Sequence, residues 1–181
     1  MNVILFGPPG AGKGTQAKNL VKKLNSFQIS TGDMLRDEIQ KNSEIGKKIV
    51  EDMGDGRFVS DEIVNSLIEK LIFDPSKKNK LIFDGYPRSL TQAKNLEKLL
   101  EKTNQKIDFV FSLNVNKETI IKRIEQRKTI ENRSDDDLNT IVKRYDKYME
   151  TTKPVLDFYS KNSNFYELDG SSKIEEITAK I

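Results

Sequence analysis

The chain has 181 residues, of which 35% are hydrophobic and 33% charged, with 31 basic residues against 28 acidic ones. It contains no cysteine and no histidine, which excludes disulfides, thiolate zinc sites and an imidazole general base. No stretch approaches the ~20 consecutive apolar residues of a membrane helix, and the interspersed charges do not support nucleic-acid binding. We therefore expect a cytoplasmic, non-membrane protein with one α/β core.

The predicted strands and helices alternate along the chain. Short runs rich in β-branched and aromatic residues predict strands at 3–6, 27–29, 80–84, 108–113 and 165–168. Apolar residues at helical spacing predict helices at 14–24, 61–72, 89–102 and 116–127. Residues 134–161 predict a long helix or a bent pair, which Pro154 should kink or break. This alternation indicates a mostly parallel sheet with helices on both faces.

The first predicted strand leads into a glycine-rich loop, GPPGAGK, at residues 7–13. The loop satisfies G-x-x-x-x-G-K between a strand and a helix, which is the context of a phosphate-binding loop and disfavours a merely structural turn. Backbone N–H groups and the helix dipole would hold the anion, and Lys13 would reach its terminal phosphates. Gly14 stands where Ser or Thr usually helps to place Mg²⁺, and the hydroxyl follows at Thr15.

Two further strands end in polar residues. In ISTGDMLR, residues 29–36, the hydroxyl residues and the aspartate can be helix caps alone, and the residues by themselves favour that interpretation. In LIFDGYPR, residues 81–88, Asp84 ends a strand where a carboxylate would lie beside the magnesium of a nucleotide. Gly85 and Pro87 then shape a turn that would aim Arg88 at the same point.

Arginine is scarce, because 24 of the 31 basic residues are lysine. Each of the seven arginines is therefore a candidate for a place that needs a planar, bidentate donor, although a surface salt bridge is the alternative for each. Arg123 and Arg127 lie four residues apart on a predicted helix, and Arg133 and Arg144 lie eleven apart, or about three turns. Such arginines predict a polyphosphate ligand.

Taken together and in this order, these residues resemble the adenylate kinase family, the nucleoside-monophosphate kinases that interconvert ATP plus AMP with two ADP. The segments GPPGAGKGTQA, STGDMLR, DGYPRSLTQA, R-x-x-x-R, R-S-D-D and a late D-G stand at family-like intervals over nearly the whole chain. The family's loop reads G-K-G-T, so Gly14 and Thr15 are family features. The resemblance implies a P-loop α/β fold with a five-stranded parallel sheet.

The resemblance also implies a role for each site residue. ATP would be bound by Gly10, Ala11, Gly12, Lys13, Gly14, Thr15, Arg123, Arg127 and Ser172. AMP would be bound by Thr31, Arg36, Gly85, Tyr86, Pro87, Arg88, Gln92, Arg133 and Arg144, and by the backbone of Arg57, Phe58 and Val59. The catalytic side chains would be Lys13, Arg88, Arg127, Arg133 and Arg144. Asp84 would hold Mg²⁺ through water, with Thr15 as a further metal contact. Tyr86 replaces the usual Phe.

The implied domain organisation is a core of residues 1–29, 60–125 and 134–181, a monophosphate-binding insertion at 30–59 and a short lid at 126–133. Residues 40–58 are poor in apolar side chains and glycine-punctuated, which suits a movable insertion. Five residues between Arg127 and Arg133 leave no room for the zinc-bearing lid of longer relatives, so we expect no zinc. We expect a monomer whose partners are ATP, AMP and ADP.

Two residues favour AMP as the acceptor. Thr31 in S-T-G-D and Gln92 in S-L-T-Q-A are similar to those of adenylate kinases, whereas uridylate and cytidylate kinases resemble S-A-G-D and carry Asn at the later position. A kinase for UMP or CMP remains the nearest alternative. A non-catalytic nucleotide-binding module is a second alternative, but it would have no reason to keep Arg36, Arg88 and Gln92.

Overall fold

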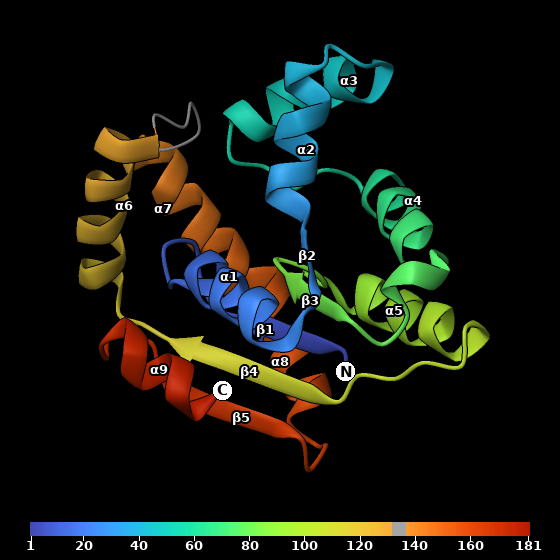
Figure 1. The fold of residues 1–181 in the computed structure, drawn as a ribbon. Coiled ribbons are helices and arrows are strands. Elements are labelled where there is room, and N and C mark those ends of the chain that lie inside the picture. The colour runs from blue at the N-terminus through green and yellow to red at the C-terminus, as the bar shows by residue number, and fades with distance from the viewer. Residues whose placement is uncertain (132–136) are drawn as a thin grey trace.

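The computed structural model describes residues 1–131 and 137–181 (Figure 1). In these residues five parallel strands form one sheet in the order β2-β3-β1-β4-β5. The strands are β1 (Val3–Phe6), β2 (Phe27–Ser30), β3 (Leu81–Asp84), β4 (Phe109–Asn114) and β5 (Phe165–Asp169). Every predicted strand is confirmed, and its ends differ from the prediction by no more than one residue.

Nine α-helices connect and flank the strands in the described part of the chain. They are α1 (Lys13–Leu24), α2 (Thr31–Gln40), α3 (Glu44–Gly54), α4 (Asp61–Ile72), α5 (Leu90–Lys102), α6 (Lys117–Glu131), α7 (Leu138–Lys147), α8 (Lys153–Tyr159) and α9 (Ile174–Lys180). A short 3-10 helix, η1 (Pro75–Lys77), follows α4. None of these helices is long and apolar enough to cross a bilayer.

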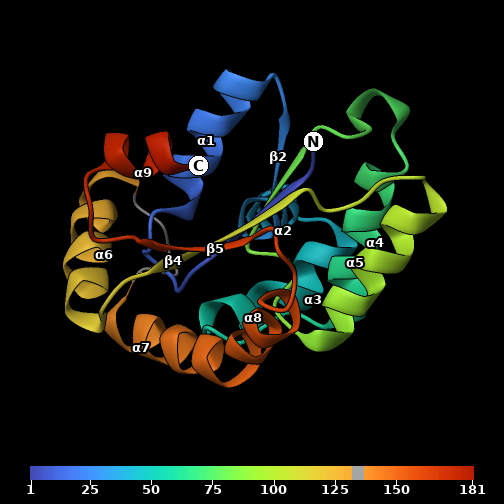
Figure 2. The same cartoon turned by 90° about the horizontal axis from the view of Figure 1, so that it is seen from below.

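Alternate residues of β1 pack into different layers of the core. Ile4 and Phe6 belong to a cluster with apolar residues of α4, α5 and α8, whereas Val3 and Leu5 pack with Ala17 and Leu20 of α1. This two-sided burial is what a central parallel strand requires. Figure 2 shows the result, with α1 and α9 on one side of the sheet and α5 and α8 on the other.

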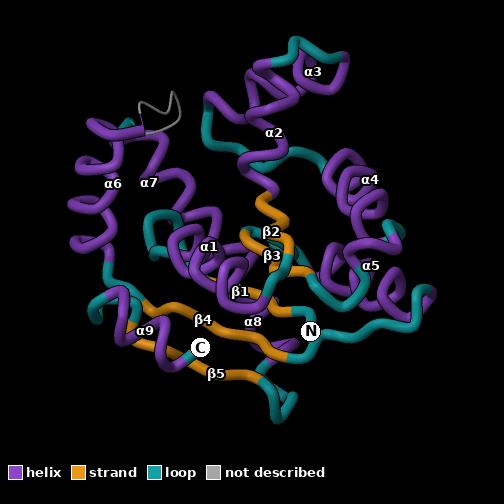
Figure 3. Tube along the Cα trace, viewed as in Figure 1, coloured by secondary structure: helices purple, strands orange, loops and turns teal. Residues whose placement is uncertain are grey.

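The helices α2 and α3 stand beyond the carboxyl end of β2, apart from the sheet (Figure 3). They occupy most of the predicted insertion, but α3 is a regular helix where the sequence indicated only an apolar-poor segment. Ser43 accepts a hydrogen bond from Gly46 N and begins α3, and Ile49 is buried. A β-carbon at Gly46 would lie 2.1 Å from Glu38 O, so the two helices pack closely because this residue is glycine.

The chain departs from α-helical geometry just before Pro154, where a kink or break was predicted, but it stays helical. A π-helical turn, η2 (Tyr148–Thr152), separates α7 from α8, and Pro154 lies in the first turn of α8, where its missing N–H costs little. Thr152 is buried and donates a hydrogen bond to Arg88 O, 3.1 Å away. The irregular turn therefore braces the loop after β3.

Candidate active site

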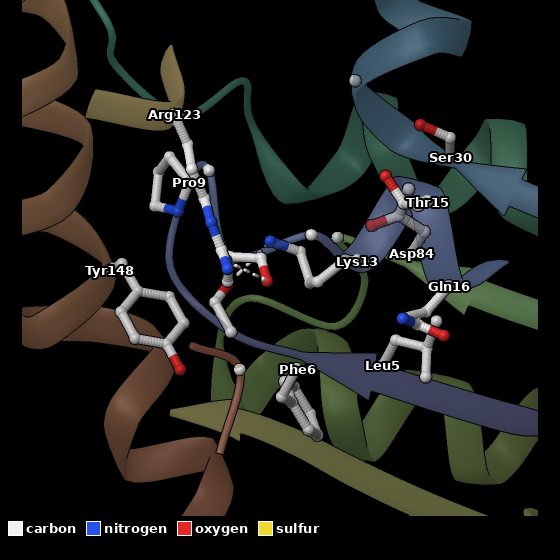
Figure 4. Close-up of a pocket in the computed structure, with 18 of the residues that line it drawn as sticks. Leu5, Phe6, Pro9, Lys13, Thr15, Gln16, Ser30, Asp84, Arg123 and Tyr148 are labelled. Carbon is white, nitrogen blue, oxygen red and sulfur yellow. Dashed lines mark hydrogen bonds between the residues drawn. The ribbon is translucent and has the colours of Figure 1, made fainter. Parts of the chain in front are cut away.

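A cavity of about 560 Å³ lies at the carboxyl ends of the strands (Figure 4). Phe6, Ser30 and Asp84 line it, and each is the last residue of its strand. Gly170, directly after β5, lines it as well. Open α/β sheets bind their ligands at this edge, so the cavity has the position of a substrate site.

Most of the predicted site residues meet in this single cavity. Its lining includes Gly10, Ala11, Gly12, Lys13, Gly14, Thr15, Arg36, Phe58, Asp84, Gly85, Pro87, Arg88, Arg123, Arg127, Arg144 and Ser172. These residues come from segments separated by more than 150 positions in the sequence. The fold thus brings residues predicted for ATP and residues predicted for AMP to one cavity.

The loop between β1 and α1 has the backbone of an anion-binding loop. Gly10 and Gly12 have φ angles of 79° and 96°, values that side-chain-bearing residues rarely adopt. A β-carbon at Gly10 would also lie 2.9 Å from Ile124 of α6. The helix α1 starts at Lys13, so its first N–H groups and its positive dipole end border the cavity.

Lys13 lies among other positively charged side chains of the cavity. Its Nζ donates to Gly7 O at 2.7 Å and to Pro8 O at 3.0 Å. Burial lowers the pKa of Lys13 to about 8, and the positive charges of three arginines, Arg88, Arg144 and Arg127, act in the same direction while Asp84 opposes them. An anionic ligand would relieve this repulsion, so the arrangement favours a polyphosphate.

Arg88 is held in the cavity wall at several points. Its Nε donates to Gly85 O at 2.7 Å, one Nη donates to Thr31 Oγ1 at 3.3 Å, and the guanidinium lies over the Phe58 ring at 4.9 Å. Gly85 has a φ of 76°, and a β-carbon there would approach the guanidinium to 3.0 Å. The predicted turn therefore does orient Arg88.

Four of the other described arginines, Arg36, Arg123, Arg127 and Arg144, lie around the same space. Arg36 pairs with Asp33 at 2.5 Å. Arg123 donates to Ala11 O at 3.4 Å and lies beside Pro9 on one side of Lys13, whereas Thr15 and Asp84 lie on the other side (Figure 4). Arg127 and Arg144, from α6 and α7, complete the lining. Arg133 was predicted for this group and lies outside the described residues.

Asp84 is oriented by a residue that the sequence analysis missed. Gln28 of β2 donates from Nε2 to Asp84 Oδ2 at 3.0 Å. Gln28 could have been identified from the sequence, because it is a single amide side chain between Phe27 and Ile29 in a short apolar strand. Gly14 faces the same carboxylate, because a β-carbon there would lie 3.5 Å from Oδ2, and a small residue keeps the space beside Asp84 open.

Four predicted residues lie behind the cavity wall. Thr31, Val59, Tyr86 and Gln92 are buried and do not belong to the lining. The cap interpretation holds for Ser30, which caps α2 by accepting from Asp33 N, and does not hold for Thr31, which donates to Gly85 O at 2.8 Å. Tyr86 donates to Asn65 Oδ1 at 2.7 Å.

The predicted contribution of residues 57–59 concerns their backbone. The Arg57 side chain is exposed and pairs with Asp52 at 2.8 Å and Asp55 at 2.5 Å, away from the cavity lining. These carboxylates raise the pKa of Arg57. Only Phe58 of the three residues lines the cavity, and a role for the backbone of residues 57–59 stays a prediction.

The model of the adenylate kinase family matches residues 5–164. The chain belongs to this family. An adenylate kinase of Pelagibacter ubique strain HTCC1062 is 47% identical over 207 aligned residues, covering 100% of this chain and 97% of that relative. The adenylate kinase of Mycoplasma capricolum strain California kid is 43% identical over 195 residues, covering 93% and 91%. That of Caulobacter sp. strain K31 is 42% identical over 181 residues, covering 100% and 96%.

These comparisons confirm the resemblance and the enzyme class. Membership of the adenylate kinase family makes the chain a nucleoside-monophosphate kinase, which transfers the γ-phosphoryl group of ATP reversibly to AMP and gives two ADP, maintaining adenine nucleotide balance. They do not favour the two alternatives, a UMP or CMP kinase and a non-catalytic module. The chain has 181 residues, and its alignment with the Caulobacter relative is also 181 residues long. This length agrees with a short-lid adenylate kinase.

Proposed function

We propose that this cavity holds both nucleotides of the adenylate kinase reaction, with ATP on the loop before α1 and AMP against Arg36, Phe58 and Arg88. The observation that carries the proposal is the continuity of the cavity. One space is lined by Lys13 of the loop, by Arg88 after β3 and by Arg36 of α2. A module that only binds a nucleoside triphosphate has no need of acceptor-side residues such as Arg36 and Arg88.

The chemistry asked of the protein is positioning and charge neutralisation. The acceptor phosphate oxygen is already an anion, so the transfer needs no general base, which suits a protein without histidine. Lys13, Arg127 and Arg144 would hold the moving phosphoryl group, together with Arg88 from the acceptor side and the predicted Arg133. Their donors would face the charge that spreads over the equatorial oxygens in the transition state.

The donor set beside the loop fits a hydrated Mg²⁺. Such an ion keeps several waters and takes one or two carboxylates plus substrate phosphates, and Asp84 supplies one carboxylate, with the Thr15 hydroxyl on the same side of Lys13. When bound with ATP, the ion would neutralise phosphate charge. Among the residues that the structure describes, no group of three or more His, Cys, Asp or Glu could hold a metal ion such as zinc.

Closure of two segments would complete the site. The insertion at 30–59 contains α2 and α3, which project from the sheet, and the lid at 126–133 starts within α6. Moving both toward the core of residues 1–29, 60–125 and 134–181 would bring Arg36 and Arg127 onto the phosphates and exclude water as an acceptor. We propose a monomer, because the described residues predicted for both nucleotides already come from a single chain, and we propose the cytoplasm, which the lack of cysteine suits.

A coupled assay tests the proposal. Purified protein is given Mg-ATP with AMP, GMP, CMP or UMP, and the formation of diphosphates is followed. We expect the highest kcat/KM with AMP, because Thr31 and Gln92 are similar to the residues of adenylate kinases at these positions. Preference for a pyrimidine monophosphate would contradict those assignments, and nucleotide binding without any ADP formation would contradict transfer in this cavity.

A further inference from the structure

The side-chain amide of Gln92 is buried and bonded at both ends. Its Oε1 accepts from Arg88 N at 2.7 Å, and its Nε2 donates to Asp61 Oδ1 at 2.6 Å. Only 2% of Gln92 is exposed. A backbone N–H can only donate and a carboxylate can only accept, so these two partners permit one orientation of the amide and exclude the flipped one.

Asp61 is held in place from both sides. It is the first residue of α4, where the helix dipole favours a negative charge. Its Oδ2 accepts from Ser89 Oγ at 2.9 Å, and Ser89 in turn caps α5 by accepting from Gln92 N at 3.1 Å. The carboxylate thus joins the start of α4 to the start of α5. Asp61 itself follows the predicted acceptor segment 57–59 by two residues.

In this structure Gln92 lies behind the cavity wall, between Asp61 and the backbone of Arg88, and a base that entered beside Arg88 would find bonding capacity left on its amide. Gln92 Oε1 retains a second lone pair and Nε2 a second hydrogen. This acceptor and donor match the exocyclic amine and a ring nitrogen of adenine, the pairing that glutamine makes with adenine elsewhere. A 6-oxopurine presents the opposite pattern at the 6-position and ring nitrogen 1, which only a flipped amide would match.

We propose that Asp61 is a positioning residue that makes the acceptor site selective for a 6-aminopurine over a 6-oxopurine. It acts through Gln92, whose orientation it fixes together with the Arg88 N–H, and it does not touch the reacting phosphates. The inference rests on the proposed acceptor role of Gln92. It adds a residue from α4 whose carboxylate specifies the direction in which that amide faces.

The test compares AMP with IMP, which differ in the 6-substituent and the protonation of the adjacent ring nitrogen. Asp61→Leu removes the acceptor, and we expect the ratio of kcat/KM for AMP to that for IMP to fall by roughly tenfold, mainly through KM. Asp61→Asn can still accept from Gln92, so most of the ratio should return. Glu62→Gln removes an exposed charge from the same helix turn and should leave the ratio unchanged.

Two outcomes would overturn the inference. Asp61→Leu could reduce activity with AMP and IMP equally, which would make Asp61 structural only. The effect could also persist in a Gln92→Leu background, where a residue that acts through Gln92 should add nothing. If Asp61→Leu does not fold, the smaller Asp61→Ala also removes the acceptor, and the same ratio in Asp61→Ala, Gln92→Leu and their double variant decides. A wild-type protein that fails to phosphorylate AMP would instead contradict the proposed function itself.

Discussion

Replacing Arg88 with lysine should remove most of the turnover while leaving the fold intact. The guanidinium uses its planar shape in three directions at once, toward Gly85 O, Thr31 Oγ1 and the face of Phe58. A lysine ammonium can replace one of these contacts but not the fork that would hold two phosphate oxygens. Losing one donor to developing charge costs about 10²–10³ in kcat.

The loss of structure should be much smaller than the loss of rate. The hydrogen bonds that disappear contribute about 1 kcal/mol to the free energy of unfolding, which lowers Tm by about 2–4 °C for a chain of this size. The assay measures kcat and KM for AMP with saturating Mg-ATP, alongside thermal unfolding by circular dichroism. Lys94→Arg, an exposed exchange on α5, serves as the control. A kcat within about threefold of wild type would refute the proposed clamp.

Three further predictions concern the donor side. Gly10→Ala would place a side chain at a positive φ and push it against Ile124, so the affinity for ATP should fall at least tenfold. Calorimetry measures this affinity, and an unchanged value would contradict the proposed role of the loop. Bound phosphates should raise the pKa of Lys13 from about 8, so the protein should take up protons when ATP binds at pH 8–9 but not at pH 6.5. Calorimetry in buffers of different ionisation enthalpy measures this uptake, and equal uptake at both pH values would contradict the prediction. Gln28→Leu removes the donor to Asp84 and should raise the Mg²⁺ concentration needed for half-maximal rate, whereas an unchanged concentration would exclude that role.

The features that the sequence predicted are local ones. Strands such as β3 are short apolar runs between turn residues, and the loop at residues 7–13 carries its own pattern of glycines and lysine. The irregular turn before α8 lies where Pro154 predicted a kink or break. The candidate arginines were found because lysine dominates elsewhere, so a retained arginine carries information about its site.

The features that it missed depend on the packing of distant segments. Gln28 and Asp84 come together because β2 and β3 are neighbours in the sheet, an order that periodicity does not reveal. Asp61 meets Gln92 only once α4 packs on α5. The residues alone could not decide which hydroxyl caps α2, because both Ser30 and Thr31 can cap a helix, and Thr31 instead donates to Gly85 O, far along the chain.

The central claim is that one cavity accepts both nucleotides at once. Titration of the protein with two adenosines joined by five phosphates, monitored by calorimetry, tests it most directly. We expect one bound molecule per chain, which ATP and AMP each displace competitively. Its affinity should fall at least tenfold in both Lys13→Met and Arg88→Lys. Competition with only one of the two nucleotides would contradict the claim.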